Sequence, residues 1–124
     1  MKRLLMLVAT VVLTLSVSQV FAADREAISK NVDAMVTAID GGKTATDFAA
    51  DAYTPYVFIM DATGKLLVHP KLAGKDLKEV AKPIYDALQA ATPAGIWVQY
   101  QWDGKEKNTY AKKTKNNLTV ASGY

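Results

Sequence analysis

The sequence predicts an α+β domain built around an antiparallel sheet of about five strands. Two observations carry this prediction. Five short stretches have the apolar, β-branched and aromatic character or the alternation typical of strands, and two longer stretches place apolar residues at helical spacing. The strand-like stretches are residues 56–60, 66–68, 96–102, 108–115 and 118–124, and the helical ones are residues 24–40 and 76–91. Because no internal repeat or linker divides them, we expect the helices to pack against one sheet.

Residues 1–22 have the pattern of a secretory signal peptide. Lys2 and Arg3 form a basic start, residues 4–15 are mostly apolar, and residues 20–22 suit a cleavage site. The alternative is an uncleaved membrane anchor, because the apolar stretch approaches the ~20 residues that a span requires. Polar residues dilute this stretch, and Ala22-Ala23 at its end favours cleavage. We therefore expect a periplasmic protein with a single domain at residues 23–124.

Composition excludes several classes of site. The chain carries 15 Lys and Arg against 12 Asp and Glu, and Lys2 and Arg3 lie in the leader, so the net charge falls from +3 to +1 after cleavage. No clustered basic surface of the kind that binds nucleic acid is expected. With no cysteine, disulfides, thiolate metal sites and cysteine nucleophiles are excluded, and one histidine cannot build a histidine-rich metal centre. We expect no metal and no cofactor.

The first helix, at residues 24–40, is amphipathic and should end at Gly41-Gly42. Its apolar face consists of Ile28, Val32, Met35, Val36 and Ile39. A second, short helix is expected at residues 44–53, before Thr54-Pro55 breaks it.

Residues 56–68 read as two strands joined by a tight turn. The first strand is apolar throughout, as in a strand buried on both faces. Asp61 can accept a hydrogen bond from the backbone two residues on, and Gly64 tolerates a positive φ. His69-Pro70 ends the second strand, because proline cannot donate to the ladder.

Asp76 is a candidate N-cap for the helix at residues 76–91. Pro83 removes a helical hydrogen bond, so we expect a kink or two shorter helices.

In the strand at 96–102, alternation places Trp97 and two glutamines on one face and Tyr100 and Trp102 on the other. Turns are expected at residues 103–104 and 116–117.

The ordered set YVFIMDATGKLLVHPKLAGKDL, GIWVQYQW, KNTYAKK and LTVASGY resembles the Cache domain family over about residues 44–124. Cache domains are extracytoplasmic sensor modules with a PAS-like sheet. The resemblance implies a PAS-like fold with a long N-terminal helix and further helices between strands two and three. It also implies a small-ligand pocket on one face of the sheet, roofed by the loop and helix between those strands. Ligands of such domains include short carboxylic acids, amino acids and amines.

Family members usually lie between two membrane segments and signal to a cytoplasmic kinase or chemotaxis module. This chain ends after its last strand, so we expect it to signal through a separate partner, such as a membrane receptor or kinase. A homodimer through the N-terminal helix is a further expectation.

His69 matches the HP motif of the family and can donate a hydrogen bond to an anionic group. Its alternative role is to satisfy backbone groups where the strand ends. Aromatic residues of the strands (Tyr56, Trp97, Tyr100 and Trp102) can line a pocket or simply form core. Arg25 is the only arginine after the leader, so the expected cation is Lys71, Lys112 or protonated His69. The candidate ligand-binding residues are His69, Tyr56, Lys71, Trp97, Tyr100, Tyr110 and Lys112.

Catalysis is not expected. His69 lacks a plausible serine nucleophile, and no P-loop, dinucleotide fingerprint or spaced carboxylate pair occurs. Asp61 resembles a calcium ligand, but one acid falls far short of the number that calcium requires. The leading hypothesis is therefore a periplasmic protein that binds a short carboxylic acid or similar metabolite. The alternatives are an interaction or structural module with a filled pocket and, if the leader is retained, a membrane-anchored accessory of a sensor.

Overall fold

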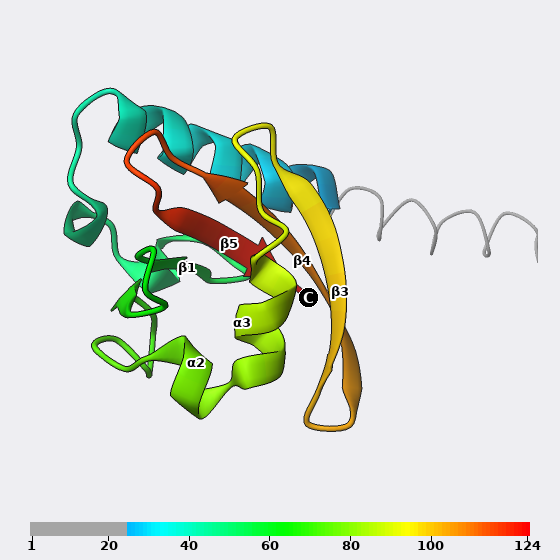
Figure 1. The fold of residues 1–124 in the computed structure, drawn as a ribbon. Helices are drawn as coiled ribbons and strands as arrows, with labels where there is room; N and C mark the ends of the chain where they lie inside the picture. Colours follow the sequence, from blue (N-terminus) through cyan, green and yellow to red (C-terminus); the bar gives the residue numbers. More distant parts are fainter. Residues whose placement is uncertain (1–24) are drawn as a thin grey trace, which may run out of the picture.

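An antiparallel five-stranded sheet organises residues 25–124, the part of the chain that the computed structural model describes (Figure 1). The strands lie in the order β2-β1-β5-β4-β3. They are β1 (Val57–Met60), β2 (Leu66–Val68), β3 (Ile96–Trp102), β4 (Lys105–Lys113) and β5 (Thr119–Gly123). The predicted α+β class with an antiparallel sheet is confirmed. The leader predicted at residues 1–22 lies outside the described residues.

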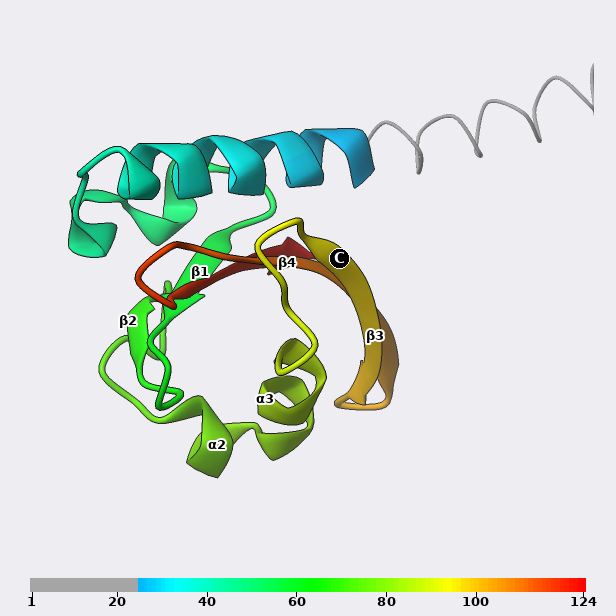
Figure 2. The ribbon, with the colours of Figure 1, turned by 45° about the horizontal axis from the view of Figure 1, so that its top comes forward.

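The N-terminal helix, residues 25–40, covers one face of the sheet (Figure 2). Its predicted apolar face is buried, with Ile28, Val32 and Met35 at most 1 % exposed. These side chains pack against Val57 and Ile59 of β1. The predicted helix and the stripe by which it packs are therefore confirmed over the described residues.

Two short helices, α2 (Leu77–Val80) and α3 (Lys82–Leu88), lie across the other face (Figure 2). As predicted, Asp76 caps α2, because its Oδ1 accepts a hydrogen bond of 2.9 Å from the Lys78 N–H. The predicted division of this region into two helices is also confirmed. The break falls at Ala81, whose φ of −155° and ψ of 62° are not helical, and Pro83 occupies the first turn of α3.

The sheet has a core on each face, and this explains why β1 is apolar at every position. Val57 and Ile59 face the N-terminal helix, whereas Phe58 and Met60 pack with Leu77 and its neighbours beneath α2 and α3. The prediction that β1 is buried on both faces is confirmed.

The prediction of a second helix at residues 44–53 is wrong. The chain instead forms two single 3₁₀ turns, η1 (Ala45–Asp47) and η2 (Ala50–Ala52). The backbone is extended at Phe48 and Ala49 between them. With this extended backbone, Phe48 packs against the core cluster that includes the N-terminal helix.

The turns explain where the strands begin and end. Asp61 Oδ1 accepts from the Thr63 N–H at 2.9 Å, as predicted for the β1–β2 turn. Asp103 and Gly104 both have positive φ (54° and 75°), so a two-residue turn lets β4 begin at Lys105, three residues earlier than predicted. Asn117, with φ of 66°, takes the left-handed position of the β4–β5 turn.

Candidate ligand-binding site

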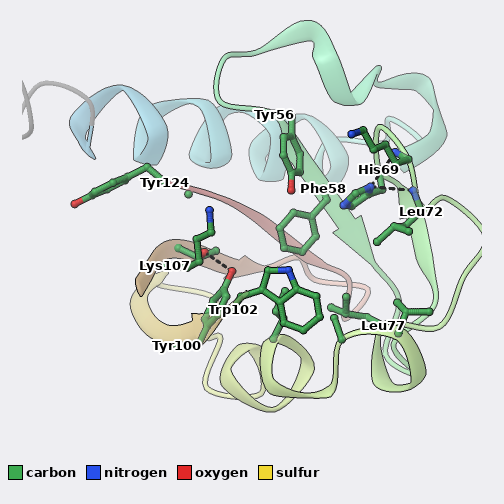
Figure 3. A pocket seen from close by; sticks show the side chains of 15 residues that line it. Tyr56, Phe58, His69, Leu72, Leu77, Tyr100, Trp102, Lys107 and Tyr124 are labelled. Atoms are coloured by element: carbon green, nitrogen blue, oxygen red, sulfur yellow. Dashed lines mark hydrogen bonds between the residues drawn. The ribbon is translucent and has the colours of Figure 1, made fainter. Parts of the chain in front are cut away.

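A cavity of about 520 Å³ lies between the sheet and the layer formed by α2 and α3 (Figure 3). On this face the central strands present small residues. Thr109 of β4 and Gly123 of β5 line the cavity, and Ala111 and Ala121 lie in the core beside it. Larger side chains at these positions would occupy the space between the layers. The cavity has the size of a typical small-molecule site.

Most of the cavity wall is apolar or aromatic. Phe58 of β1 and Trp102 of β3 extend into it from either side of the two central strands, and Leu77 and Ile84 close it from the helical layer (Figure 3). Trp102 is 38 % exposed and Tyr56 is 44 % exposed, so the cavity opens to solvent on this side. A ligand entering it would exchange water for an apolar surface.

His69 stands at one end of the cavity, directly after β2. Its Nδ1 accepts hydrogen bonds from the backbone N–H groups of Lys71 and Leu72, both at 3.0 Å. A nitrogen that accepts carries no proton, so the neutral ring holds its proton on Nε2. Figure 3 shows Nε2 turned away from this loop and toward the cavity. The structural role considered from the sequence is therefore present, and it leaves one donor for a ligand.

The environment of His69 favours the neutral ring. Burial, and then the positive charge of Lys71, lower the pKa of His69 below its usual value. Tyr56 packs edge-on against the imidazole with ring centroids 5.2 Å apart, and the Phe58 ring lies at 6.0 Å. The imidazole is thus a neutral donor near pH 7. The cations at the cavity are Lys71 and Lys107 instead of a protonated His69.

We expect the free energy of unfolding to rise as the pH increases toward and just past the usual histidine pKa of about 6.5, and the His69→Asn variant to lack this contribution to the slope. The unfolded chain binds a proton at His69 near pH 6.5, whereas the folded chain binds it only at lower pH. The stabilisation is complete above the unfolded pKa and is lost as the pH falls toward the folded one. Since His69 is the only histidine, urea denaturation at stepped pH measures it directly. An equal slope in the variant would contradict the assignment.

The other end of the cavity carries hydroxyl groups and a cation. Tyr100 and Thr109 form a hydrogen bond of 2.8 Å between their hydroxyls. Burial raises the pKa of Tyr100 and of Tyr56, so both phenols remain protonated at neutral pH. Lys107 lies beside Tyr100 on the neighbouring strand, on the opposite side of the cavity from His69 (Figure 3).

The charged side chains that line the cavity all carry positive charge. Among residues 25–124, Lys71 and Lys107 are its two cations, and no Asp or Glu side chain lines it. Within residues 25–124 no three His, Asp or Glu side chains gather as a metal site requires. The arrangement therefore suits an anionic group attached to an apolar body, held by hydrogen bonds and lysine charge.

Four of the seven residues predicted to bind a ligand line this cavity, namely Tyr56, His69, Lys71 and Tyr100. The other three, Trp97, Tyr110 and Lys112, lie on the opposite face of the sheet, toward the N-terminal helix. There the guanidinium carbon of Arg25 lies 4.3 Å from the centre of the Trp97 ring.

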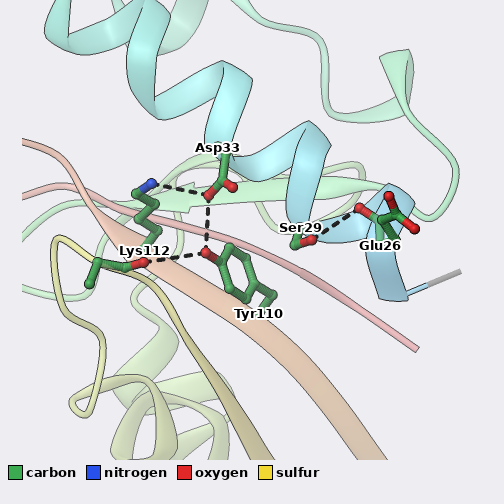
Figure 4. A network of polar contacts seen from close by, with 6 residues as sticks. Glu26, Ser29, Asp33, Tyr110 and Lys112 are labelled. Atoms are coloured by element: carbon green, nitrogen blue, oxygen red, sulfur yellow. Dashed lines mark hydrogen bonds and ion pairs between the residues drawn. The ribbon is translucent and has the colours of Figure 1, made fainter. Parts of the chain in front are cut away.

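Tyr110 and Lys112 join β4 to the N-terminal helix through Asp33 (Figure 4). Asp33 Oδ1 accepts a hydrogen bond of 3.0 Å from the Tyr110 hydroxyl and one of 3.1 Å from Lys112 Nζ. Burial, the hydrogen bond and the charge of Asp33 together raise the pKa of Tyr110. These two polar side chains are thus engaged within the fold.

Lys112 also borders a second, polar hollow between the end of the N-terminal helix and the β4–β5 turn. Its polar groups are already paired in part, because Asp40 accepts from the Lys115 N–H at 2.8 Å and Lys112 pairs with Asp33. The first cavity has the larger share of apolar lining, and it is the better candidate site.

Several residues that line the cavity are not among the seven predicted ligand-binding residues. Trp102 is among the aromatic residues that the sequence allows as pocket lining, and its alternation with Tyr100 places both on the cavity face. Lys107 lies outside the predicted strand, which began at residue 108, and Thr109 lies inside it but in a stretch that looked merely polar. The signal for them is the Asp103-Gly104 turn, which fixes the pairing of Tyr100 with Lys107. The further lining residues are Phe58, Leu72, Leu77, Val80, Ala81, Ile84, Gly123 and Tyr124.

Comparisons with known proteins give no assignment. No protein-family model matches the chain, and a search of curated proteins finds no match. Among the described residues, no helix has both the length and the apolarity needed to cross a bilayer.

Proposed function

We propose that this protein is a small-molecule-binding domain of the Cache, PAS-like sensor type, and that its cavity binds a carboxylate with an apolar body. The cavity lies where the resemblance implies a pocket, on one face of the sheet beneath the region between β2 and β3. The single observation that carries the proposal is this open cavity of about 520 Å³, which the described part of the chain lines with mostly apolar side chains, two lysines and no acidic side chain. It also disfavours the alternative of an interaction module with a filled pocket.

Binding uses groups that are already in place. The Nε2–H of His69 donates to a carboxylate oxygen, because the backbone N–H groups of Lys71 and Leu72 fix the ring and its tautomer. The protonated hydroxyls of Tyr56 and Tyr100 supply further donors. The hydrocarbon part of the ligand lies against Phe58 and Trp102. A site fixed in this way loses little side-chain freedom on binding.

The role that follows is capture of a metabolite without catalysis. With the leader pattern at residues 1–22, the protein acts in the periplasm and passes ligand occupancy to a separate membrane receptor or kinase. Mass spectrometry of the exported protein tests the location, with a mature N-terminus at Ala23 as the supporting result. A retained leader in the exported protein would instead support the membrane-anchored alternative.

A thermal-shift screen of the purified protein tests the binding proposal. The panel contains aliphatic and aromatic carboxylates, with amino acids and amines as comparison classes. A carboxylate at a hundredfold excess over its Kd adds about 2.7 kcal/mol to the stability of the native state. For a domain of this size, the melting temperature should rise by roughly 10 °C or more.

The matched variant for this screen is His69→Asn. Asparagine can still accept the Lys71 and Leu72 N–H groups, as it does in turns and caps, but it has no counterpart of Nε2–H in the cavity. We expect a normally folded protein with an affinity about tenfold weaker or more. If amines alone stabilise the protein, the carboxylate preference is wrong. If no class does, the filled-pocket interaction module becomes the better account.

A further inference from the structure

The two edge strands of the sheet differ in whether their outward backbone N–H and C=O groups are already hydrogen-bonded. At one edge, β2 has only three residues, and the backbone groups of Leu66 are paired with the following loop. The Leu66 N–H donates to the Lys75 carbonyl at 2.8 Å, and the Leu66 carbonyl accepts from the Gly74 N–H at 2.7 Å. This edge offers little to another strand.

At the other edge, β3 has seven residues and pairs on one side only, with β4 (Figure 1). The two-residue turn makes Trp102 and Lys105 a hydrogen-bonded pair, and such pairs recur at every second position. The N–H and C=O groups of Trp97, Gln99 and Gln101 therefore point outward. Within residues 25–124, no backbone hydrogen bond from another segment reaches these three residues.

This edge also lacks the devices that usually prevent strand association. Exposed edge strands commonly carry lysine or another charge, a proline or a bulge. The sequence of β3 is IWVQYQW, with no charge and no proline, and its pairing with β4 is uninterrupted over all seven positions. A strand of this kind readily adds another strand.

The side chains of β3 are self-complementary in one antiparallel register. If Gln99 lies opposite Gln99 of a second copy, Ile96 lies opposite the second copy's Trp102, and Val98 lies opposite its Tyr100. Ile96 and Trp102 share one face of the sheet, and each is 38 % exposed in the single chain. The pairing covers both side chains, and twofold symmetry repeats the Ile96–Trp102 contact on each side of the axis.

We propose that β3 pairs antiparallel with β3 of a second copy, centred on Gln99, to form a homodimer with one continuous ten-stranded sheet. The outward groups of Trp97, Gln99 and Gln101 give three hydrogen-bonded pairs across the axis. This contact differs from the dimer through the N-terminal helix expected from the sequence. It is independent of the proposed ligand, so either proposal can fail alone.

A comparison of Gln99→Pro with Gln99→Ser tests the backbone contact by sedimentation velocity. Proline at Gln99 removes an N–H that points away from β4, so the fold tolerates it, but the central pair is lost. Serine keeps that N–H, and both variants lose the Gln99–Asn108 side-chain hydrogen bond of 2.8 Å. We expect the serine variant to dimerise like the wild type and the proline variant to dimerise at least tenfold more weakly.

Cysteine variants test the register, because the chain has no cysteine of its own. At the axis, Gln99→Cys places two Cα atoms about 5.5 Å apart, within disulfide range. In Gln101→Cys, the two cysteines are offset along the strands by four residues, so their Cα atoms lie roughly 14 Å apart. Under mild oxidation only Gln99→Cys should form a covalent dimer quickly. A wild-type protein that stays monomeric at millimolar concentration, unimpaired dimerisation of Gln99→Pro, or equal crosslinking of both cysteine variants would each overturn the proposal.

Discussion

Replacing Gly123 with alanine should lower the free energy of unfolding by about 3 kcal/mol, one of the two largest effects that we expect. A Cβ at this position of β5 would collide with the Asn108 carbonyl oxygen and would lie 2.8 Å from Thr109 Cα. Both obstacles belong to the backbone of β4, which cannot rotate away as a side chain can. The change should therefore separate β5 from β4 at the floor of the cavity.

Urea denaturation and thermal melting measure this effect, and the melting temperature should fall by roughly 10–20 °C. Gly104→Ala is the control. Its Cβ would meet nothing within 4 Å, so the positive φ of 75° is the only source of strain, costing about 1 kcal/mol. If the two variants were equally stable, the close contact between β4 and β5 would be refuted.

Lys107→Glu should weaken carboxylate binding about a hundredfold, the other large effect. The substitution removes one of the two cations that the described residues place at the cavity, and it adds an anion where none of those residues supplies an acidic side chain. The carboxylate held by His69 lies across the cavity from this position and would meet repulsion in place of attraction through a mostly apolar interior. A hundredfold loss corresponds to about 2.7 kcal/mol. Isothermal titration of the carboxylate selected by the thermal screen measures the change.

Lys105→Glu is the matched control, since it makes the same change in net charge two residues away on β4. Lys105 is exposed and does not line the cavity. Exposed charges at a distance are largely screened by salt, so this variant should bind within a few-fold of the wild type. Equal losses in the two variants would show that long-range charge, and not a contact at the cavity, governs binding.

Much of the fold could be predicted because local chemistry determines it. The Asp61 side chain organises the first turn, Asp76 caps α2, and Pro83 begins a new helix after the break at Ala81. The failure at residues 44–53 is different in kind. The extended backbone at Phe48 serves packing against the N-terminal helix, and no local pattern encodes that contact.

The site was predictable in part. The register of the β3–β4 hairpin explains why some predicted residues line the cavity and others lie on the opposite face. The Asp103-Gly104 turn pairs Trp97 with Tyr110, so these two share a face, and Tyr100 shares the other with Lys107. Alternation separates the two sets, but it does not reveal that the cavity lies on the Tyr100 face. That depends on which helices cover each face. The loop that returns its N–H groups to His69 Nδ1 likewise depends on tertiary structure.

The most direct test of a carboxylate in this cavity is an NMR spectrum of the His69 imidazole, recorded during titration with the carboxylate selected by the screen. The single histidine gives one set of imidazole signals. We expect Nε2 to carry the proton throughout, with its signal moving to saturation in step with binding while the Nδ1 signal changes little. An imidazole spectrum unchanged at saturating ligand would place the ligand elsewhere and contradict the proposed site.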